Sequence, residues 1–375
     1  MNFISCNCLY HFSASLLVKM IKMLYNTAIL RTKVILMIQA FGKTPNGQEA
    51  KRYTICNGSI RAEFTDYGAT LVALYVPDRN GNLADVVLGY DDVMGYVNDD
   101  FCIGATVGRN SNRIKGSRFT LNGQVYALAQ NDNDNNLHSG PDFFSQRFWQ
   151  VEDHQKDRII FRLDSPDGDQ GFPGNATVRV LFQLEAPGTL QVSYEAVSDQ
   201  DTVFNMTNHS YFNLAGHENT DKAVHQILTI PASRFLVSDS TCTPTGEIRN
   251  VEASPFDFRK PKAISRDIDA DYETLRLQLG YDHCYLNETP MCAQLLDPDS
   301  GRCMKVFTDM PGVQLFSGND LNLTGKGNTF YPAYSGICLE TQYYPDAINH
   351  PQWPQPILRA GMIFQSTTSF VFTAE

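Results

Sequence analysis

The sequence predicts an all-β protein built as a large antiparallel β-sandwich. Its 375 residues include 23 Phe and 17 Tyr together with 26 Gly and 18 Pro, a composition that favours many strands joined by tight turns. Short runs in which apolar and polar residues alternate recur from Thr54 onward. Helical periodicity is scarce beyond the first 40 residues, so a helical fold is not indicated.

The first 40 residues differ from the rest of the chain. They carry Lys19, Lys22, Arg31 and Lys33 but no acidic residue. These charges interrupt the apolar runs before they reach the ~20 residues that a membrane-spanning helix needs. The order of basic and apolar residues does not fit a signal peptide either. We interpret residues 1–40 as a poorly ordered N-terminal extension, or as sequence upstream of an internal start methionine that is not translated.

The remainder of the chain is expected to form one domain, residues 41–375, because neither a repeat nor a low-complexity linker divides it. The whole chain has a formal charge of −11, and without the four basic residues of the extension 26 basic residues face 41 acidic ones, a charge of −15. Such an acidic body should repel nucleic acid and anionic lipid, so neither nucleic acid nor membrane is expected as a partner. The nine cysteines contain no CxxC pair, so we predict a reduced, cytoplasmic protein.

Turn residues locate two hairpins. Residues 77–81 (PDRNG) follow the apolar run 70–76 and have the composition of a turn. Residues 178–184 and 190–196 alternate in the same way on either side of Pro187-Gly188, which predicts a second hairpin. Strands with one apolar and one polar face are typical of a sandwich, whose concave sheet can hold a small polar ligand.

The most informative segment spans residues 204–216, because it sets a histidine among amide, hydroxyl and phenol groups. If it is a strand, alternation predicts two different faces. The polar face would contain Asn205, Thr207, His209 and Tyr211, and the apolar face would contain Phe204, Met206 and Phe212. Histidine titrates close to neutrality, so His209 could both give and take a proton. The alternative is that His209 only satisfies a buried polar network.

Five further segments place polar side chains beside strand-like flanks. These residues are Asn112 and Arg113, His138, Asp282, Gln314 and Glu340. Taken singly, the first three are more typical of a solvated loop or turn than of a functional site. Glu340 closes an apolar strand, so partial desolvation should raise its basicity. The alternative for Glu340 is a structural ion pair with an arginine such as Arg113.

Together these groups suit a neutral, polyhydroxylated small molecule, because sugars need many short hydrogen bonds and little charge. A phosphate ligand would require several Arg or Lys residues or a glycine-rich loop before a helix, and the sequence offers neither. A metal site built from His138, His209 and a carboxylate stays open, although no short-range ligand spacing supports it.

These motifs resemble those of the aldose 1-epimerases, also called galactose mutarotases. The similarity covers nearly everything after residue 41, and its motifs follow the family's order. The matching segments are 108–109 (GR), 112–114 (NRI), 136–138 (NLH), 171–174 (GFPG), 207–214 (TNHSYFNL), 255–259 (PFDFR), 281–283 (YDH), 312–314 (GVQ) and 339–342 (LETQ). Two features depart from the pattern: Ser139-Gly140 stands where many members have two glycines, and the first 40 residues have no counterpart.

The resemblance implies a galactose mutarotase-like supersandwich and an isomerase that interconverts the α and β anomers of free hexoses such as glucose and galactose, without a metal or organic cofactor. It implies that Glu340 is the general base for the C1 hydroxyl and that His209 is the general acid for the ring oxygen. His138 and Arg113 would hold the sugar, and the set would be completed by Asn112, Asp282 and Gln314.

Such chemistry at neutral pH predicts an ionised Glu340 beside a protonated His209. Three rival functions stay open. The first is a glycoside hydrolase that uses Asp282 and Glu340 as paired carboxylates. The second, an epimerase of hexose 6-phosphates, is disfavoured by the acidic body. The third is a non-catalytic sugar-binding module, which would not require a matched acid and base. The sequence indicates neither the preferred aldose nor the oligomeric state.

Overall fold

The computed structural model describes residues 37–375, so nearly all of the predicted extension lies outside the described residues. Strand β1 (Ile38–Lys43) already includes the last three residues assigned to it. Three large sheets and five two-stranded sheets form the framework of the described chain. Its two α-helices, α2 (Val93–Val97) and α3 (Glu273–Leu277), have five residues each. The prediction of an all-β fold is therefore confirmed. No helix of residues 37–375 is long and apolar enough to cross a membrane.

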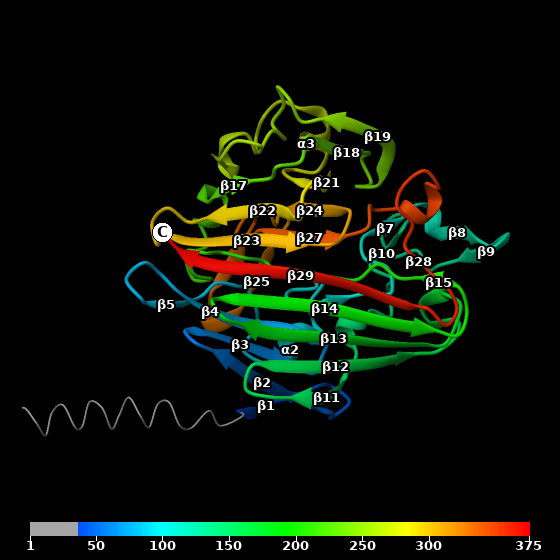
Figure 1. The fold of residues 1–375 in the computed structure, drawn as a ribbon, viewed down its shortest axis with the longest axis horizontal. Coiled ribbons are helices and arrows are strands. Elements are labelled where there is room, and N and C mark those ends of the chain that lie inside the picture. Colours follow the sequence, from blue (N-terminus) through cyan, green and yellow to red (C-terminus); the bar gives the residue numbers. More distant parts are fainter. Residues whose placement is uncertain (1–36) are drawn as a thin grey trace, which may run out of the picture.

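The largest sheet has nine strands, paired antiparallel, and runs across the molecule (Figure 1). In order across the sheet, the strands are β11 (Gln150–His154), β12 (Arg158–Ser165), β13 (Ala176–Glu185), β14 (Thr189–Ser198), β29 (Ile363–Ala374), β23 (Arg302–Thr308), β22 (Met291–Leu296), β17 (Ile227–Thr229) and β20 (Lys262–Ala263). The predicted hairpin at Pro187-Gly188 is confirmed as β13 and β14. The last strand in chain order, β29, lies at the centre of the sheet, between β14 and β23.

Two five-stranded sheets pack against this large sheet. The first contains β1, β2 (Glu49–Asn57), β3 (Ile60–Thr65), β4 (Thr70–Pro77) and β5 (Leu83–Asp85). Its β4–β5 turn confirms the hairpin predicted at residues 77–81. The second, in order across the sheet, contains β19 (Pro244–Asn250), β18 (Arg234–Ser238), β21 (Asp282–Leu286), β24 (Gly312–Phe316) and β27 (Cys338–Gln342).

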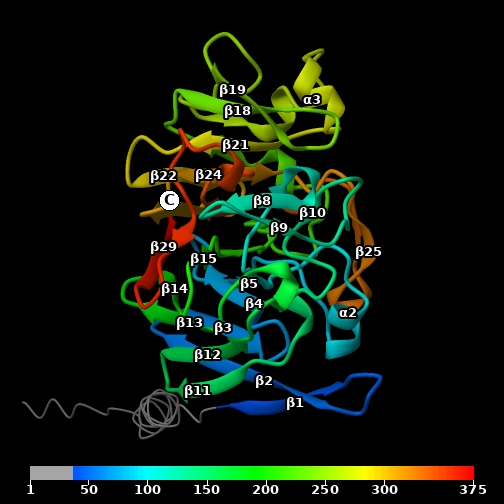
Figure 2. The ribbon, with the colours of Figure 1, turned by 90° about the vertical axis from the view of Figure 1, so that its right-hand side faces the viewer.

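One hydrophobic core joins the three sheets and makes the fold a sandwich. The rings of Phe64 on β3 and Phe182 on β13 lie 4.5 Å apart between their centroids. Leu339 on β27 and Phe370 on β29 belong to the same buried cluster. Figure 2 shows the first five-stranded sheet alongside β11–β14, with β18, β19 and α3 at the other end of the molecule. The alternating apolar residues of the sequence therefore face a shared interior.

Short strand pairs connect the large sheets and position the loops between them. They are β6 (Thr106–Val107) with β16 (Thr207–Asn208), β7 (Arg113–Ile114) with β10 (Asn136–Leu137), β8 (Arg118–Leu121) with β9 (Gln124–Ala127), β15 (Thr202–Val203) with β28 (Ile357–Leu358), and β25 (Asn322–Thr324) with β26 (Phe330–Pro332).

The prediction that residues 204–213 form a strand with one solvated face is wrong. Only Thr207 and Asn208 are strand residues, and every residue of this segment is buried. The segment is covered on both sides, since Phe212 packs on Phe370 of β29 while the Tyr211 hydroxyl donates to the carbonyl of Phe101. Most of its polar side chains make individual hydrogen bonds, as buried polar groups normally do, although the hydroxyl of Thr207 has no partner within residues 37–375.

Candidate active site

A cleft of about 300 Å³ opens beside the second five-stranded sheet. Six of the seven predicted site residues line it, namely Asn112, Arg113, His138, His209, Asp282 and Glu340. Gln314 does not line the cleft, but its Nε2 donates to Oδ1 of Asp282 at 2.6 Å. Residues that lie more than 200 positions apart in the sequence are thus brought to one cavity.

Glu340 is the central residue of β27 and pairs with Gln314 of β24. The prediction that it closes the strand is therefore wrong, because Thr341 and Gln342 continue the pairing to Val313 and Gly312. Glu340 is only 2% exposed, and its Oε2 has no hydrogen-bond partner within residues 37–375. A buried carboxyl oxygen without a partner is costly unless a ligand completes it.

His209 lies next to this carboxyl group. Its Nε2 is 3.6 Å from Oε1 of Glu340. The alternative of a Glu340–Arg113 ion pair is not found, because Arg113 directs its Nε to Oδ2 of Asp132 at 2.6 Å. The His138 and His209 rings meet edge to face, 5.4 Å apart between centroids. The two histidines and Glu340 therefore form one contiguous group on the cleft wall.

His138 is fixed by the backbone of the loop that carries Asn112. The backbone N–H of Asn112 donates to Nδ1 of His138 at 3.1 Å, and the N–H of His138 donates back to the carbonyl of Asn112 at 3.1 Å. Both residues adopt a left-handed backbone, with φ of +60° and +54°. Because Nδ1 accepts a hydrogen bond, the proton of the neutral ring sits on Nε2. Burial lowers the pKa of His138 well below its usual value, which keeps the ring neutral.

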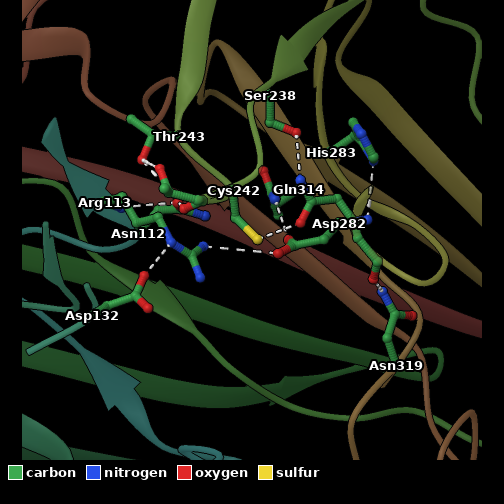
Figure 3. A network of polar contacts seen from close by, with 12 residues as sticks. Asn112, Arg113, Asp132, Ser238, Cys242, Thr243, Asp282, His283, Gln314 and Asn319 are labelled. Carbon is green, nitrogen blue, oxygen red and sulfur yellow. Dashed lines mark hydrogen bonds and ion pairs between the residues drawn. The ribbon is translucent and has the colours of Figure 1, made fainter. Parts of the chain in front are cut away.

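Arg113, Asp282 and Gln314 form a polar network beside the cleft (Figure 3). Nη1 of Arg113 is 3.8 Å from Oδ2 of Asp282, whose other oxygen accepts from Gln314. The Asp282 carboxylate is thus held between a guanidinium group and an amide. This arrangement leaves guanidinium donors and carboxylate lone pairs beside the cavity, the kind of groups that bind neighbouring sugar hydroxyls.

Burial controls the protonation of the Glu340–His209 pair. It raises the pKa of Glu340 well above its usual value and lowers the pKa of His209 to about 4. Burial therefore opposes both charges and favours a protonated carboxyl group beside a neutral imidazole. The ionised Glu340 beside a protonated His209 stays a prediction for the enzyme with bound sugar, and the burial of both groups opposes it. The charged pair and the neutral pair each hold one exchangeable proton, which lies on His209 in the charged pair and on Glu340 in the neutral pair.

Sequence reasoning did not single out Cys338, whose Sγ is 3.7 Å from Nδ1 of His209. The signal was present, because residues two apart in a strand share a face and Glu340 follows Cys338 at that spacing. Cys242, on a loop at the cleft wall, was also missed. All seven cysteines of the described part are free thiols. In residues 37–375, no three His, Cys, Asp or Glu side chains are grouped as a metal site would require.

Comparison with known proteins assigns the family. Residues 51–371 match the family model described as aldose 1-epimerase. The chain belongs to the aldose 1-epimerase family. It is 39% identical over 340 residues to a galactose mutarotase of Bos taurus and 35% identical to an aldose 1-epimerase of Escherichia coli (strain K12). These matches cover 89% and 88% of this chain and 97% of each relative.

Solved structures of aldose 1-epimerase relatives share the fold. A GalM/aldose epimerase homologue from C. elegans superimposes with a TM-score of 0.80 at 30% identity, covering 85% of this chain and 98% of that one. A galactose 1-epimerase from Lactobacillus acidophilus NCFM also gives a TM-score of 0.80, at 26% identity, with coverage of 91% and 99%. The antiparallel sandwich predicted from the sequence is therefore the fold of this family.

Proposed function

We propose that this aldose 1-epimerase interconverts the α and β anomers of free hexoses such as glucose and galactose, with Glu340 as general base and His209 as general acid. The observation that carries the proposal is the contact between these two buried groups on the wall of one polar cleft. The names of the relatives, galactose mutarotase and aldose 1-epimerase, point to the same reaction.

The reaction requires only two proton transfers and the breaking of one bond. Glu340 takes the proton of the C1 hydroxyl, the bond between C1 and the ring oxygen breaks, and Nε2 of His209 gives a proton to that oxygen. Rotation about the C1–C2 bond then exposes the other face of the aldehyde, and the same steps run in reverse. Positioned acid and base groups each contribute roughly 100- to 10,000-fold to such a reaction.

The burial of the pair supports this direction of transfer. Ring opening starts from an ionised Glu340 and a protonated His209 and ends with both groups neutral. Burial favours the neutral pair, since it raises the pKa of Glu340 and lowers that of His209. Desolvation of the pair therefore favours opening of the bound ring. Binding of the closed sugar must supply the hydrogen bonds that stabilise the charged pair.

The remaining predicted residues fit roles in binding. His138 offers an N–H at Nε2, and Arg113 offers guanidinium donors, beside the ring oxygen that His209 protonates. Asp282, oriented by Gln314, accepts hydrogen bonds from sugar hydroxyls, and Asn112 joins them on the cleft wall. This set matches a neutral polyhydroxylated ligand, because its donors and acceptors are numerous and its charges are locally compensated.

Polarimetry tests the proposal directly. We expect the wild type to accelerate the change in optical rotation of fresh α-D-glucose and α-D-galactose. Glu340→Gln and His209→Asn should each lower kcat by at least ~100-fold, because each removes one of the two proton transfers. A matched control is Glu63→Gln, which neutralises another buried carboxylate, on β3 and outside the cleft, and should keep normal activity. Near-normal turnover of Glu340→Gln would rule out its role as the base.

The same assay separates the rival functions. A hydrolase would release a new reducing sugar from a methyl glycoside, whereas an epimerase leaves that glycoside intact. A sugar-binding module would leave the rotation of the free sugar changing at its uncatalysed rate. Accelerated rotation of free sugars with no new product is the outcome expected here.

A further inference from the structure

Strand β27 contacts both ring nitrogens of His209. Glu340 faces Nε2 at 3.6 Å, and Sγ of Cys338, two residues earlier on the same strand face, lies 3.7 Å from Nδ1. Cys338 is fully buried, and His209 is 6% exposed. The imidazole is thus held between two side chains of one strand, and its two nitrogens have different chemical surroundings.

We propose that Cys338 is a positioning residue whose sulfur accepts a hydrogen bond from Nδ1–H of His209, so that Nε2 is the nitrogen that exchanges a proton with the substrate. A neutral imidazole carries its proton on one nitrogen only. The tautomer protonated on Nδ1 leaves a lone pair on Nε2, and only this tautomer can receive a proton from Glu340 or from a sugar hydroxyl across the cleft.

The surroundings of Nδ1 favour this tautomer. Burial raises the pKa of the Cys338 thiol well above its usual value, so the sulfur is a neutral, weak acceptor. A weak acceptor at Nδ1 stabilises the protonated imidazole much less than a carboxylate would. The pKa of His209 therefore stays low, and the protonated ring gives up its proton readily.

The neighbouring histidine provides an internal comparison. Nδ1 of His138 accepts the backbone N–H of Asn112, so His138 carries its proton on Nε2. The two rings, in edge-to-face contact, are therefore assigned opposite tautomers. His138 presents a fixed N–H donor to the cleft, whereas His209 presents Nε2, which can take up and release a proton. The tautomer of His138 is set by the backbone, whereas that of His209 depends on a replaceable side chain.

Nitrogen-15 NMR of histidine-labelled protein at pH 7 tests the assignment, with His209 and His138 identified through the variants His209→Asn and His138→Asn. We expect protonated Nδ1 and unprotonated Nε2 in His209, and the reverse in His138. Cys338→Ala should shift His209 toward the other tautomer and lower kcat roughly three- to tenfold, the loss expected for one hydrogen bond, with KM within about twofold. Cys338→Ser supplies an oxygen acceptor, so it should keep the wild-type tautomer and move the acid limb of the pH–rate profile upward.

Cys292→Ala is the matched control, because Cys292 is equally buried but donates to the carbonyl of Val306 in the nine-stranded sheet. It should leave the tautomers and kcat unchanged. A wild-type His209 protonated on Nε2 would overturn the proposal. So would a Cys338→Ala variant with unaltered tautomer and pH profile, even if its kcat fell. The inference rests on the proposed function only for its kinetic part, since the NMR signals report the tautomer whether or not His209 and Glu340 prove catalytic.

Discussion

At the scale of single residues, the Glu340–His209 pair decides how the protein responds to pH. In the proposed mechanism, activity requires one proton shared by the pair. Below pH about 4 His209 binds a second proton, and above the raised pKa of Glu340 the pair loses its only one. We therefore expect kcat/KM, measured by polarimetry, to stay level through pH 6.5 and to fall only near pH 4. An acid limb centred near 6.5 would show that His209 titrates as a solvated histidine.

The same burial should lower the stability of the folded protein. An unfolded Glu ionises near pH 4.5, whereas the folded pKa of Glu340 lies well above this value. Its contribution to the free energy of unfolding is therefore complete below pH 4.5 and declines by about 1.4 kcal/mol per pH unit up to the folded pKa. Glu340→Gln cannot titrate, so its Tm should exceed that of the wild type by more at pH 8 than at pH 5. A difference that does not change with pH would contradict this expectation.

Sequence reasoning identified the site residues better than their electrostatics. Glu340 and His209 could be singled out because an acid and a base within polar motifs suggest proton transfer. Their pKa values could not be anticipated, because desolvation depends on which segments cover them, and those segments come from distant parts of the chain. Cys338 was overlooked for a related reason. Its spacing from Glu340 predicts a shared strand face, but its contact with His209 depends on a neighbour from a distant part of the chain.

At the scale of elements, Arg109 holds a loop in place. Its fully buried guanidinium group donates to the carbonyls of Ser165, Pro166, Pro173 and Gly174, with distances of 2.8–2.9 Å. These contacts join two segments that were singled out by resemblance, 108–109 and 171–174. No carboxylate of residues 37–375 lies within ion-pair distance of this arginine, so the planar fork of donors, more than the charge, matches the loop.

Arg109→Lys should therefore destabilise the protein although it keeps the charge. An ammonium group presents three donors from one point and cannot reach four carbonyls, and each buried carbonyl without a partner costs roughly 1–3 kcal/mol. We expect a loss of at least roughly 3 kcal/mol in chemical denaturation. Arg179→Lys is the control, since Arg179 lies in a half-exposed ion-pair cluster, and its change should stay within about 0.5 kcal/mol. Equal stabilities of the two variants would refute the role of Arg109.

Regular strands could be predicted, but irregular ones could not. The β13–β14 hairpin was located because one face is buried and the other is half-exposed along ten residues. Residues 204–213 also alternate, yet they lie between layers and are buried on both faces. In such a segment most polar side chains make separate hydrogen bonds with neighbouring groups of the protein. The alternation of polar and apolar residues therefore no longer indicates a face exposed to solvent.

At the scale of the whole molecule, Lys326 ties the C-terminal part of the chain to the first sheet. Its Nζ donates to the carbonyls of Val72 and Val87 at 2.9 and 2.8 Å and pairs with Asp85. The three partner groups are distant from Lys326 in sequence but are buried together with it. The arrangement of the sheets thus depends on long-range polar contacts as well as on the shared core, and neither can be read from local patterns.

Replacing Lys326 by Met should leave the buried Asp85 carboxylate without its cation and cost roughly 3–5 kcal/mol. Adding Asp85→Asn should recover part of this loss, because it removes the uncompensated charge. Thermal unfolding of both single variants and of the double variant measures the coupling. Lys222→Met removes an exposed pair with Asp299 and should cost less than about 1 kcal/mol. Additive effects of the two changes at positions 85 and 326 would disprove the coupling.

The position of β29 has a consequence for biosynthesis. Ribosomes make β11–β14 early and β22 and β23 later, but within the nine-stranded sheet the two groups are joined only by pairing with β29, the strand translated after all of them. Until it emerges from the exit tunnel, β14 and β23 both expose an unsatisfied edge. The nascent polypeptide is therefore prone to aggregate through these two strand edges until β29 is synthesised and pairs with both of them.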